Sequence, residues 1–204
     1  MTSPVEMPAN HHADHPGFSG PVGALCGLAF LIVGRANARL AADAVGVSRQ
    51  DRVVDIGCGP GTAAREAARR GATVTGVDPA PVMLRLARLC TRDAAIDWRQ
   101  GVAERVPLPD GSATVVWSLA TVHHWKDLDA GLSEAHRLLV PGGRLLAVER
   151  QSPPGATGIA SHGWTRQQVD SFVAQCRSAG FGDIEAETRK VGRRDVWVVR
   201  ANRP

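Results

Sequence analysis

A glycine-rich segment between two apolar runs most strongly constrains what this chain can fold into. Residues 52–78 read RVVDIGCGPGTAAREAARRGATVTGVD. The first run, 52–57, is short and rich in β-branched residues, which predicts a buried strand. Three glycines then let the backbone turn sharply into a helix over 62–70. A second strand follows at 72–78, and this order of elements is typical of a doubly wound parallel sheet.

The rest of the chain continues to alternate between strands and helices. We expect further strands at 96–100, 113–120 and 144–149, and helices at 81–91, 127–140 and 165–179. The turn Pro141-Gly142-Gly143 is expected to stop the helix before it. Two last strands, 181–191 and 195–201, have no room for a helix between them and predict a β-hairpin. The predicted fold class is α/β, with a doubly wound, mostly parallel seven-stranded sheet that ends in a C-terminal β-hairpin.

The length of 204 residues suits one domain. Residues 1–19 are polar and rich in Pro and His, and we expect a flexible tail there. Residues 20–204 are expected to form a single domain, with a helical cover over 20–46. The apolar run 21–34 has 14 residues, fewer than the roughly 20 that span a bilayer. No stable membrane insertion is therefore expected, and the start of the chain does not resemble a signal peptide.

Charge and cysteine content exclude several classes of protein. The net charge of +4 comes from scattered, mostly arginine residues, so we expect no nucleic-acid partner. The cysteines Cys26, Cys58, Cys90 and Cys176 form no CxxC pair, which favours free thiols and a cytoplasmic location. A metal could be held by His11, His12 and His15, but beyond Asp14 no carboxylate or thiol supports them. The sequence therefore predicts no metal site.

The glycine segment also predicts a ligand site. In a doubly wound sheet it lies beyond the carboxyl ends of the strands, where ligands bind. Asp78 ends the next strand, and its carboxylate can accept two hydrogen bonds from a ribose diol; the alternative is an ordinary turn aspartate before Pro79. The spacing G-x-G-x-G differs from the dinucleotide fingerprint G-x-G-x-x-G. The loop alone leaves NAD and S-adenosylmethionine as competing cofactors.

Further segments extend this pattern into a family resemblance. DIGCGPG, GVD, GVAERVPLPDGSATVVWSLATVHHW and LLVPGGRLLAVE together resemble the class I S-adenosylmethionine-dependent methyltransferases, over about residues 53–149. The resemblance is closest to the small-molecule branch that includes ubiquinone/menaquinone methyltransferases. It implies S-adenosyl-L-methionine as cofactor and methyl transfer to a small-molecule acceptor by in-line displacement. The terminal hairpin agrees with the seven-stranded sheet of that family.

The resemblance also implies a set of cofactor-binding residues. They are Asp55, Gly57, Cys58, Gly59, Gly61, Asp78, Pro79, Met83, Val102, Ala103, Glu104, Ser118 and Leu119. Asp55 would help to hold the amino group and Asp78 the ribose hydroxyls, while Met83 would pack on the adenosine. One position departs from the family, because an acidic residue that bonds the adenine amino group is usual where this chain has Val102. Cofactor affinity is expected to be lower unless Glu104 or the backbone substitutes.

Candidate catalytic residues follow the strand expected at 113–120. His123 and His124 lie at the rim where the acceptor should enter, and a histidine can take a proton from a hydroxyl near neutral pH. The structural alternative is that one caps the next helix or packs against Trp125. Trp125 and Trp164 are candidate pocket walls, whereas Trp117 and Trp197 are expected in the core.

A second copy of the chain could complete the acceptor pocket, so a homodimer is one of two expectations. The segment 151–163, where relatives often carry a lid, is short and is expected to be flexible. His162 could reach the pocket from this segment, but a position in solvent is expected. That leaves either an open pocket closed mainly by the N-terminal helix, or one completed in a homodimer.

Three other functions remain alternatives. One is a protein that binds S-adenosylmethionine without transferring its methyl group. Another is an RNA methyltransferase, although enzymes that methylate base amino groups usually carry Asn/Asp-Pro-Pro-aromatic where this chain reads SLATVHH. A dinucleotide oxidoreductase is the third, and both the glycine spacing and the terminal hairpin disfavour it.

Overall fold

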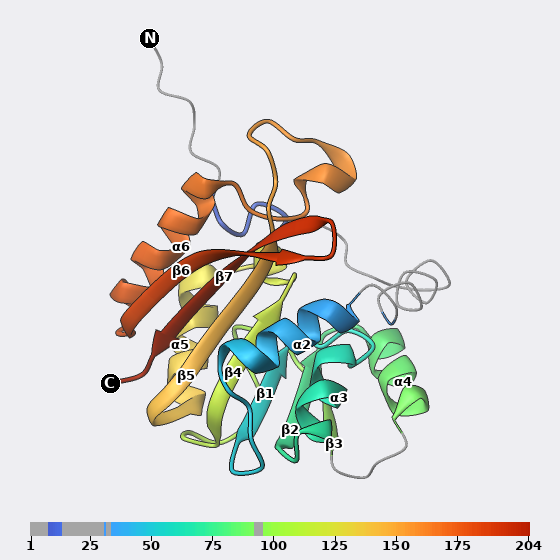
Figure 1. The fold of residues 1–204 in the computed structure, drawn as a ribbon. Helices are drawn as coiled ribbons and strands as arrows, with labels where there is room; N and C mark the ends of the chain where they lie inside the picture. Colours follow the sequence, from blue (N-terminus) through green and yellow to red (C-terminus); the bar gives the residue numbers. More distant parts are fainter. Residues whose placement is uncertain (1–7, 14–30, 32–33, 92–95) are drawn as a thin grey trace.

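Five parallel strands and one antiparallel hairpin form a single central sheet (Figure 1). The structure is a computed structural model that describes residues 8–13, 31, 34–91 and 96–204. The strands are β1 (Arg52–Ile56), β2 (Thr73–Asp78), β3 (Ile96–Gln100), β4 (Ala113–Leu119), β5 (Leu139–Arg150), β6 (Gly182–Val191) and β7 (Arg194–Asn202). Their order across the sheet is β3-β2-β1-β4-β5-β7-β6. β7 runs antiparallel to both β5 and β6, which confirms the predicted fold class.

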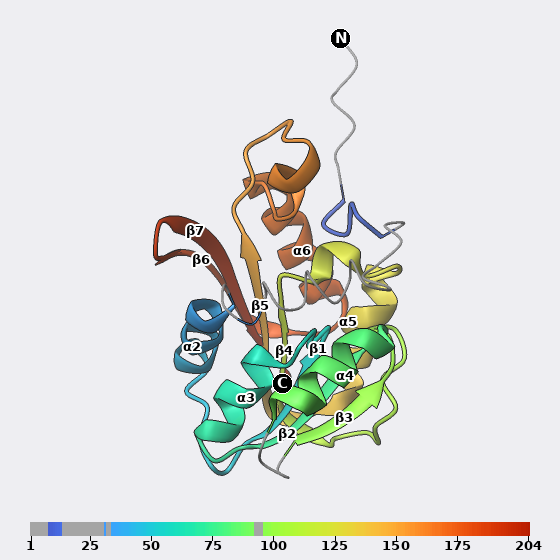
Figure 2. The same cartoon turned by 90° about the vertical axis from the view of Figure 1, so that its right-hand side faces the viewer.

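Helices cover both faces of the sheet. They are α2 (Arg35–Ala44), α3 (Thr62–Arg69), α4 (Pro81–Cys90), α5 (Leu128–Leu138) and α6 (Arg166–Ser178), with 3₁₀ helices at Val122–His124 and Gly158–Ser161. One core cluster joins α2 and α3 to the sheet, and a second joins α5 and α6 to it (Figures 1 and 2). The first is built from small residues, since Ala63, Ala64 and Ala67 are the buried apolar face of α3. Small side chains let this helix lie close to the strands beneath it.

β5 is longer than the sequence predicts. We expected a strand from residue 144, after a Pro-Gly-Gly turn, but β5 begins at Leu139 and runs through Pro141, Gly142 and Gly143. The end of the chain supplies the reason. The N–H of Gly142 donates to the carbonyl of Arg203 at 2.8 Å, and the N–H of Arg203 donates to the carbonyl of Gly143 at 2.8 Å. These bonds satisfy backbone groups of the two glycines within an irregular stretch of β5, where Gly142 has φ of +76° and the pairing with β4 shifts register.

Part of the expected N-terminal tail is packed against the domain. Ala9 is fully buried, and the indole N–H of Trp164 donates to its carbonyl at 2.7 Å. The side chain of Gln168 in α6 donates to the carbonyl of Pro8 at 3.0 Å. Figures 1 and 2 both show this segment, in dark blue, beside α6. Residues 8–13 therefore belong to the packed structure, whereas the boundary at residue 19 lies outside the described residues and stays a prediction.

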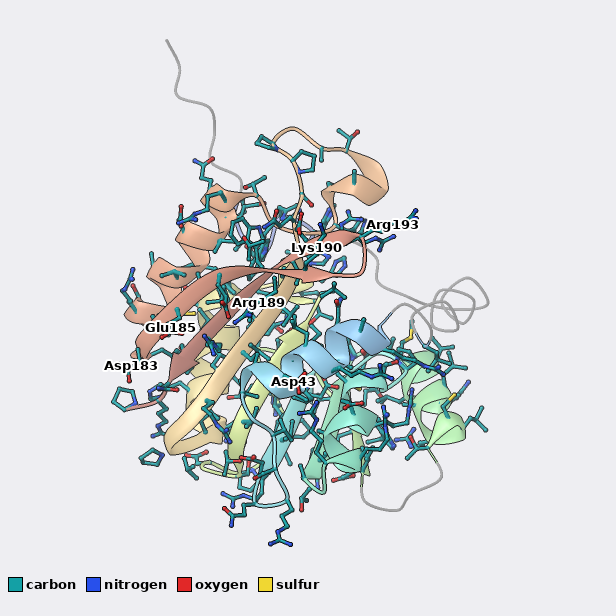
Figure 3. All side chains as sticks on the ribbon, in the orientation of Figure 1. Asp43, Asp183, Glu185, Arg189, Lys190 and Arg193 are labelled. Atoms are coloured by element: carbon teal, nitrogen blue, oxygen red, sulfur yellow. The ribbon has the colours of Figure 1, made fainter. Side chains whose placement is uncertain are left out.

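The outer strand of the hairpin is highly charged. Figure 3 shows Asp183 and Glu185 near the start of β6, and Arg189, Lys190 and Arg193 toward the turn. Among the described residues, β6 pairs with β7 alone and forms an edge of the sheet. Charged side chains on such an edge discourage pairing with another chain. This charge has a structural explanation and does not need a nucleic-acid partner.

Within the described residues, no helix is long and apolar enough to cross a membrane. The predicted helical cover over 20–46 is seen as α2 in its last part. Almost all of the apolar run 21–34 lies outside the described residues.

Candidate functional site

The glycine loop follows β1 at the carboxyl edge of the sheet, where β1 lies between β2 and β4. The strand order reverses at this point, and ligands bind at such a point in open α/β sheets. Two hydrogen bonds fix the start of the loop. The N–H groups of Gly57 and Cys58 both donate to the carbonyl of Val77 in β2, at 2.8 and 3.0 Å. The sequence therefore located the loop correctly at the end of the first strand.

The three loop glycines have different surroundings. Gly57, Gly59 and Gly61 have φ of +72°, +53° and +79°, where other residues are strained. A Cβ on Gly57 would lie 2.5 Å from Oγ1 of Thr121, and a Cβ on Gly61 would lie 2.2 Å from the Trp98 ring. A Cβ on Gly59 would meet no described atom within 4 Å. Close packing thus accounts for two of the glycines, and Gly59 borders open space.

Asp55 is a buried carboxylate under the start of α3. Its residue is 2% exposed, and Oδ2 has no hydrogen-bond partner among the described residues. Burial raises the pKa of Asp55 to about 7, Asp78 raises it further, and the Trp117 indole and the Ala64 backbone N–H oppose the rise. An unpartnered buried oxygen is costly unless something binds it. A cationic group of a ligand would satisfy it.

Asp78 joins the end of β2 to the glycine loop. Its Oδ2 accepts a hydrogen bond from the N–H of Gly59 at 2.8 Å, and its Oδ1 accepts one from the N–H of Ala80 at 2.9 Å. Burial raises the pKa of Asp78, and these two bonds oppose the rise. Each carboxylate oxygen has a second lone pair, so a diol can still donate to it. Asp78 can therefore shape the loop and bind a ribose at the same time.

The expected adenine edge is exposed and apolar. Val102 is 40% exposed, whereas its neighbour Ala103 is buried. Glu104 is already engaged, because its Oε1 accepts hydrogen bonds from the N–H groups of Lys126 and Asp127 at 2.6 and 3.1 Å. Glu104 therefore holds the chain before α5. It is poorly placed to replace the missing acid at Val102.

The remaining predicted cofactor residues lie at or near the same edge of the sheet. Met83 is buried on α4, and the carbonyl of Pro79 accepts a hydrogen bond from the Gln100 side chain at 3.2 Å. Cys58 is buried, and burial raises the pKa of its thiol. Leu119 is half-buried at the end of β4. Their contact with a cofactor stays a prediction.

Ser118 takes part in a link between β4 and the glycine loop. Its hydroxyl lies 2.5 Å from that of Thr121, and Thr121 Oγ1 donates to the carbonyl of Ile56 at 3.2 Å. The same Thr121 side chain fills the space beside Gly57. Between Ser118 and Thr121 stands Ala120, with φ of +56°. This left-handed backbone turns the chain sharply out of β4 toward the histidines.

His123 is buried and hydrogen-bonded to a carboxylate that the sequence did not point to. Its Nδ1 lies 2.9 Å from Oε2 of Glu149, and the two side chains are 3% and 0% exposed. The other oxygen of Glu149 accepts the N–H of Val122 at 2.9 Å. A carboxylate can only accept, so Nδ1 of His123 carries the proton and donates. The lone pair of His123 is then on Nε2.

His124 and three more histidines surround His123. The ring centroids of His123 and His124 are 4.1 Å apart, and those of His12 and His162 are 4.3 Å apart in a stacked arrangement. The His12 backbone N–H donates to the carbonyl of His123 at 2.8 Å, while His11 stacks near His123 at 5.9 Å. Burial, foremost, lowers the pKa of His124 to about 3, and the neighbouring histidines add to this effect.

Sequence reasoning missed four contributors to this region: Glu149, Thr121, Trp98 and the segment 8–13. A carboxylate directly after the apolar run 145–148 of a strand was the available signal for Glu149. No local signal pointed to the others, since their contacts join residues that are far apart in the sequence. His162 was expected in solvent, yet it is part of the histidine cluster.

The candidate pocket walls Trp125 and Trp164 are core residues. They are 5% and 0% exposed, and the Trp164 ring packs 4.7 Å from that of Phe172 in α6. Trp117 and Trp197 are buried in the core, as expected. The tryptophans are thus structural in the described part of the chain, and polar histidines line the rim instead.

Comparison with known proteins agrees with this geometry. Residues 54–147 match a family described as "Methyltransferase domain". The chain is 37% identical over 116 residues to a demethylmenaquinone methyltransferase of Tropheryma whipplei, which covers 56% of this chain and 48% of that protein. It is 31% identical over 168 residues to the 27-O-demethylrifamycin SV methyltransferase of Amycolatopsis mediterranei, covering 75% of this chain and 62% of that one.

A solved structure shares the whole fold. The phosphoethanolamine N-methyltransferase 2 of Haemonchus contortus, in complex with S-adenosyl-L-methionine, superposes with a TM-score of 0.75 at 18% identity. The match covers 96% of this chain and 60% of that one. The chain spans about half the length of curated relatives such as the Tropheryma whipplei enzyme.

Proposed function

We propose that the chain, whose residues 54–147 match a methyltransferase-domain family, is a class I S-adenosylmethionine-dependent methyltransferase that transfers a methyl group from S-adenosyl-L-methionine to a small-molecule acceptor. One observation carries the proposal. The glycine loop, Asp55 and Asp78 meet at the β1–β4 switch point of a sheet with the order β3-β2-β1-β4-β5-β7-β6. The relatives named above support a small-molecule acceptor.

The residues present fit this cofactor. Gly59 borders open space, Asp78 keeps lone pairs for the ribose diol, and Oδ2 of Asp55 lacks a partner among the described residues. A charged amino group is a suitable partner for that oxygen. The cofactor supplies an electrophilic methyl group on its sulfonium. Asp55, Gly59 and Asp78 would hold its methionine and ribose parts.

The protein's contribution to such a reaction is positioning. In-line displacement needs the acceptor atom directly behind the methyl group, and fixing this geometry can lower the barrier by several kcal/mol. Ser118 and Leu119 end the strand that faces the loop, and Thr121 connects them to β1. His123 and His124 follow directly. We propose that these two histidines, our candidate catalytic residues, hold the polar atom of the acceptor.

Binding experiments test the cofactor first. Titration calorimetry with S-adenosylmethionine and with NAD should show binding of the former only. Asp78→Ala should weaken that binding about ten- to a hundredfold, since hydrogen bonds to a charged group are worth about 1.5–3 kcal/mol. No heat with S-adenosylmethionine at roughly 1 mM, a free energy weaker than about −4 kcal/mol, would reject the proposal.

Transfer of labelled methyl groups tests the reaction. The panel should contain phenols, hydroxyquinones and hydroxylated polyketides, with RNA as comparison. Label on small molecules but not on RNA is the expected result. Binding of the cofactor without transfer to any acceptor would favour the second candidate, a protein that binds S-adenosylmethionine and does not methylate. The exposed Val102 at the adenine edge is the observation that favours this candidate.

The proposal also includes a cytoplasmic location and an oligomeric state. Cys58, Cys90 and Cys176 are free thiols, which fits a reducing cytoplasm. A homodimer that completes the acceptor pocket is also proposed, and light scattering at several concentrations tests it. A monomer that methylates at full rate would remove the dimer from the proposal and leave the chemistry intact.

A further inference from the structure

Histidines from three distant parts of the chain meet beside the end of β4. His123 and His124 belong to the 3₁₀ helix after β4, and His162 lies in the loop between β5 and α6. One nitrogen of each of these three rings lies within 4.8 Å of a nitrogen of each of the others. Their burial ranges from complete for His123 to partial for the other two.

We propose that His123, His124 and His162 bind one divalent transition-metal ion, with zinc as the expected occupant. Three imidazoles form the donor set of well-known catalytic zinc sites, which leave a fourth position for water or a substrate atom. Neutral imidazole is a preferred donor for zinc, copper, iron and nickel. The nitrogens are already close, so modest ring rotations bring them to one ion.

Glu149 supplies the second observation that points to a metal. Histidines that bind metals almost always donate their other ring N–H to a carboxylate or a backbone carbonyl, which fixes the ring and raises its basicity. His123 makes this contact with the fully buried Glu149. His124 repeats the pattern, because its Nδ1 lies 3.4 Å from the carbonyl of His12. Both rings therefore direct Nε2, the ligating atom, away from their anchoring partner.

The other two histidines are better explained as supports. His11 uses both ring nitrogens: Nε2 donates to the carbonyl of Ser161 at 2.8 Å, and Nδ1 accepts from Gln168 at 2.9 Å. His12 stacks on His162 and its Nε2 lies 3.1 Å from Oγ of Ser161. The segment 8–13 thus fastens the loop that carries His162. These contacts explain why residues 8–13, which the sequence predicts to be a flexible tail, pack against the domain.

The location gives the ion a role in the proposed reaction. Thr121, two residues before His123, touches the glycine loop at Gly57 and bonds to the end of β1. The fourth position of the metal would hold an oxygen or nitrogen of the acceptor near the cofactor. This role rests on the proposed methyl transfer, whereas metal binding itself does not. As ligands, His123 and His124 would position the acceptor through the ion instead of removing its proton.

The experiment measures metal binding directly and without cofactor. The chain should be produced without a polyhistidine tag, stripped with a chelator, and titrated with Zn²⁺ against a chromogenic indicator. Elemental analysis of the dialysed protein gives the stoichiometry. Cobalt(II) reports geometry, because four-coordinate cobalt with nitrogen donors absorbs visible light strongly. We expect about one ion per chain and the four-coordinate cobalt spectrum.

A matched set of histidine variants decides whether the cluster is the site. His124→Gln with His162→Gln removes two partly exposed ligands, and circular dichroism checks folding. His136→Gln is the control, because His136 packs against Phe181 in another part of the fold. We expect the double variant to bind zinc at least about 100-fold more weakly and the control to bind as wild type. His123→Gln is left out because its buried position endangers folding.

The outcomes separate cleanly. Absence of a bound ion in wild type, or unchanged affinity in a folded double variant, overturns the metal site. Zinc binding that depends on His124 and His162 supports it even when no methyl transfer is found. If wild type binds zinc but transfers no methyl group to any acceptor, this result counts against the proposed function and not against the metal site.

Discussion

Nδ1 of His123 lies 2.9 Å from Oε2 of Glu149, and this pair is almost completely buried between the end of β4 and the end of β5. Ionisable groups are rarely buried without a partner, since desolvation is costly. Glu149 also accepts the Val122 N–H, so both of its oxygens are used. The pair fixes the 3₁₀ helix that carries both histidines, and it therefore links the sheet to the acceptor side of the site.

Replacing Glu149 with Gln should destabilise the fold. The Gln amide cannot accept hydrogen bonds at both of its atoms, so one buried N–H loses its partner at a cost of about 1–3 kcal/mol. Urea denaturation should show this loss in the free energy of unfolding. Glu185→Gln is the matched control, because Glu185 pairs with Arg200 on the exposed hairpin and such pairs contribute about 0–1 kcal/mol. Equal losses in the two variants would contradict the assigned importance of the buried pair.

Asp55 should make cofactor binding depend on pH. Burial raises its pKa to about 7 in the folded protein, so below this pH the carboxyl is largely protonated. A cationic amino group binds the ionised form, and the proton must leave first. Affinity for S-adenosylmethionine should therefore rise between pH 5.5 and 7, by up to about tenfold per pH unit, and then level off. Calorimetry across this range measures the slope.

The Asp55 carboxyl should also make the free energy of unfolding depend on pH, but in the opposite direction to cofactor affinity. Its folded pKa is above the unfolded value of 3.8, so the folded state binds more protons between about pH 4 and 7. Stability contributed by the neutral form is present at low pH and is lost as pH rises toward 7. Asp55→Asn should remove both trends. A pH-independent affinity in wild type would show that Asp55 does not contact the charged group.

Much of the fold could be predicted from local pattern. The strand at 96–100 has the predicted bounds, and the helices at α3, α4, α5 and α6 differ by one or two residues at their ends. Apolar periodicity, glycine and proline carry this information because they act on the chain within a few residues. β5 shows the limit. Its Pro-Gly-Gly reads as a turn between a helix and a strand, but hydrogen bonds with Arg203, far along the chain, hold it as an irregular part of β5.

Only the parts of the site that directly follow a strand in the sequence could be predicted. The glycine loop and Asp78 are consecutive with β1 and β2, so their places followed from the strand assignments. The histidine cluster depends on contacts such as that between His12 and His123, more than a hundred residues apart. The chain gives no local sign of such contacts. The role of Trp98 beside Gly61 is hidden for the same reason.

Val102 should be a position where affinity can be gained. It is exposed at the expected adenine edge, where the family that the sequence resembles is expected to have an acid, so Val102→Asp should add one hydrogen bond to the adenine amino group. A net hydrogen bond is worth about 0.5–1.5 kcal/mol, or roughly two- to twelvefold in affinity. Leu89→Asp, on the exposed side of α4 at 81% exposure, controls for the added charge. Calorimetry that finds no gain in Val102→Asp would place the adenine elsewhere.

Gly59 and Gly61 should respond differently to the same substitution. Gly59→Ala places a Cβ in open space at φ of +53°, so stability should fall by only about 1 kcal/mol while the Cβ obstructs the cofactor. Gly61→Ala would place its Cβ 2.2 Å from the Trp98 ring, so the Trp98 side chain or the loop backbone has to shift. We expect a larger stability loss there, roughly 2–4 kcal/mol.

Two double variants separate packing from cofactor binding at these glycines. Trp98→Leu frees space beside Gly61, so it should recover part of the stability that Gly61→Ala loses, and it should recover nothing for Gly59→Ala. Denaturation and calorimetry on the three single variants, the two double variants and wild type give both quantities. Full cofactor affinity in folded Gly59→Ala would mean that the open space beside Gly59 is not the cofactor site, because a Cβ cannot share that space with a bound ribose.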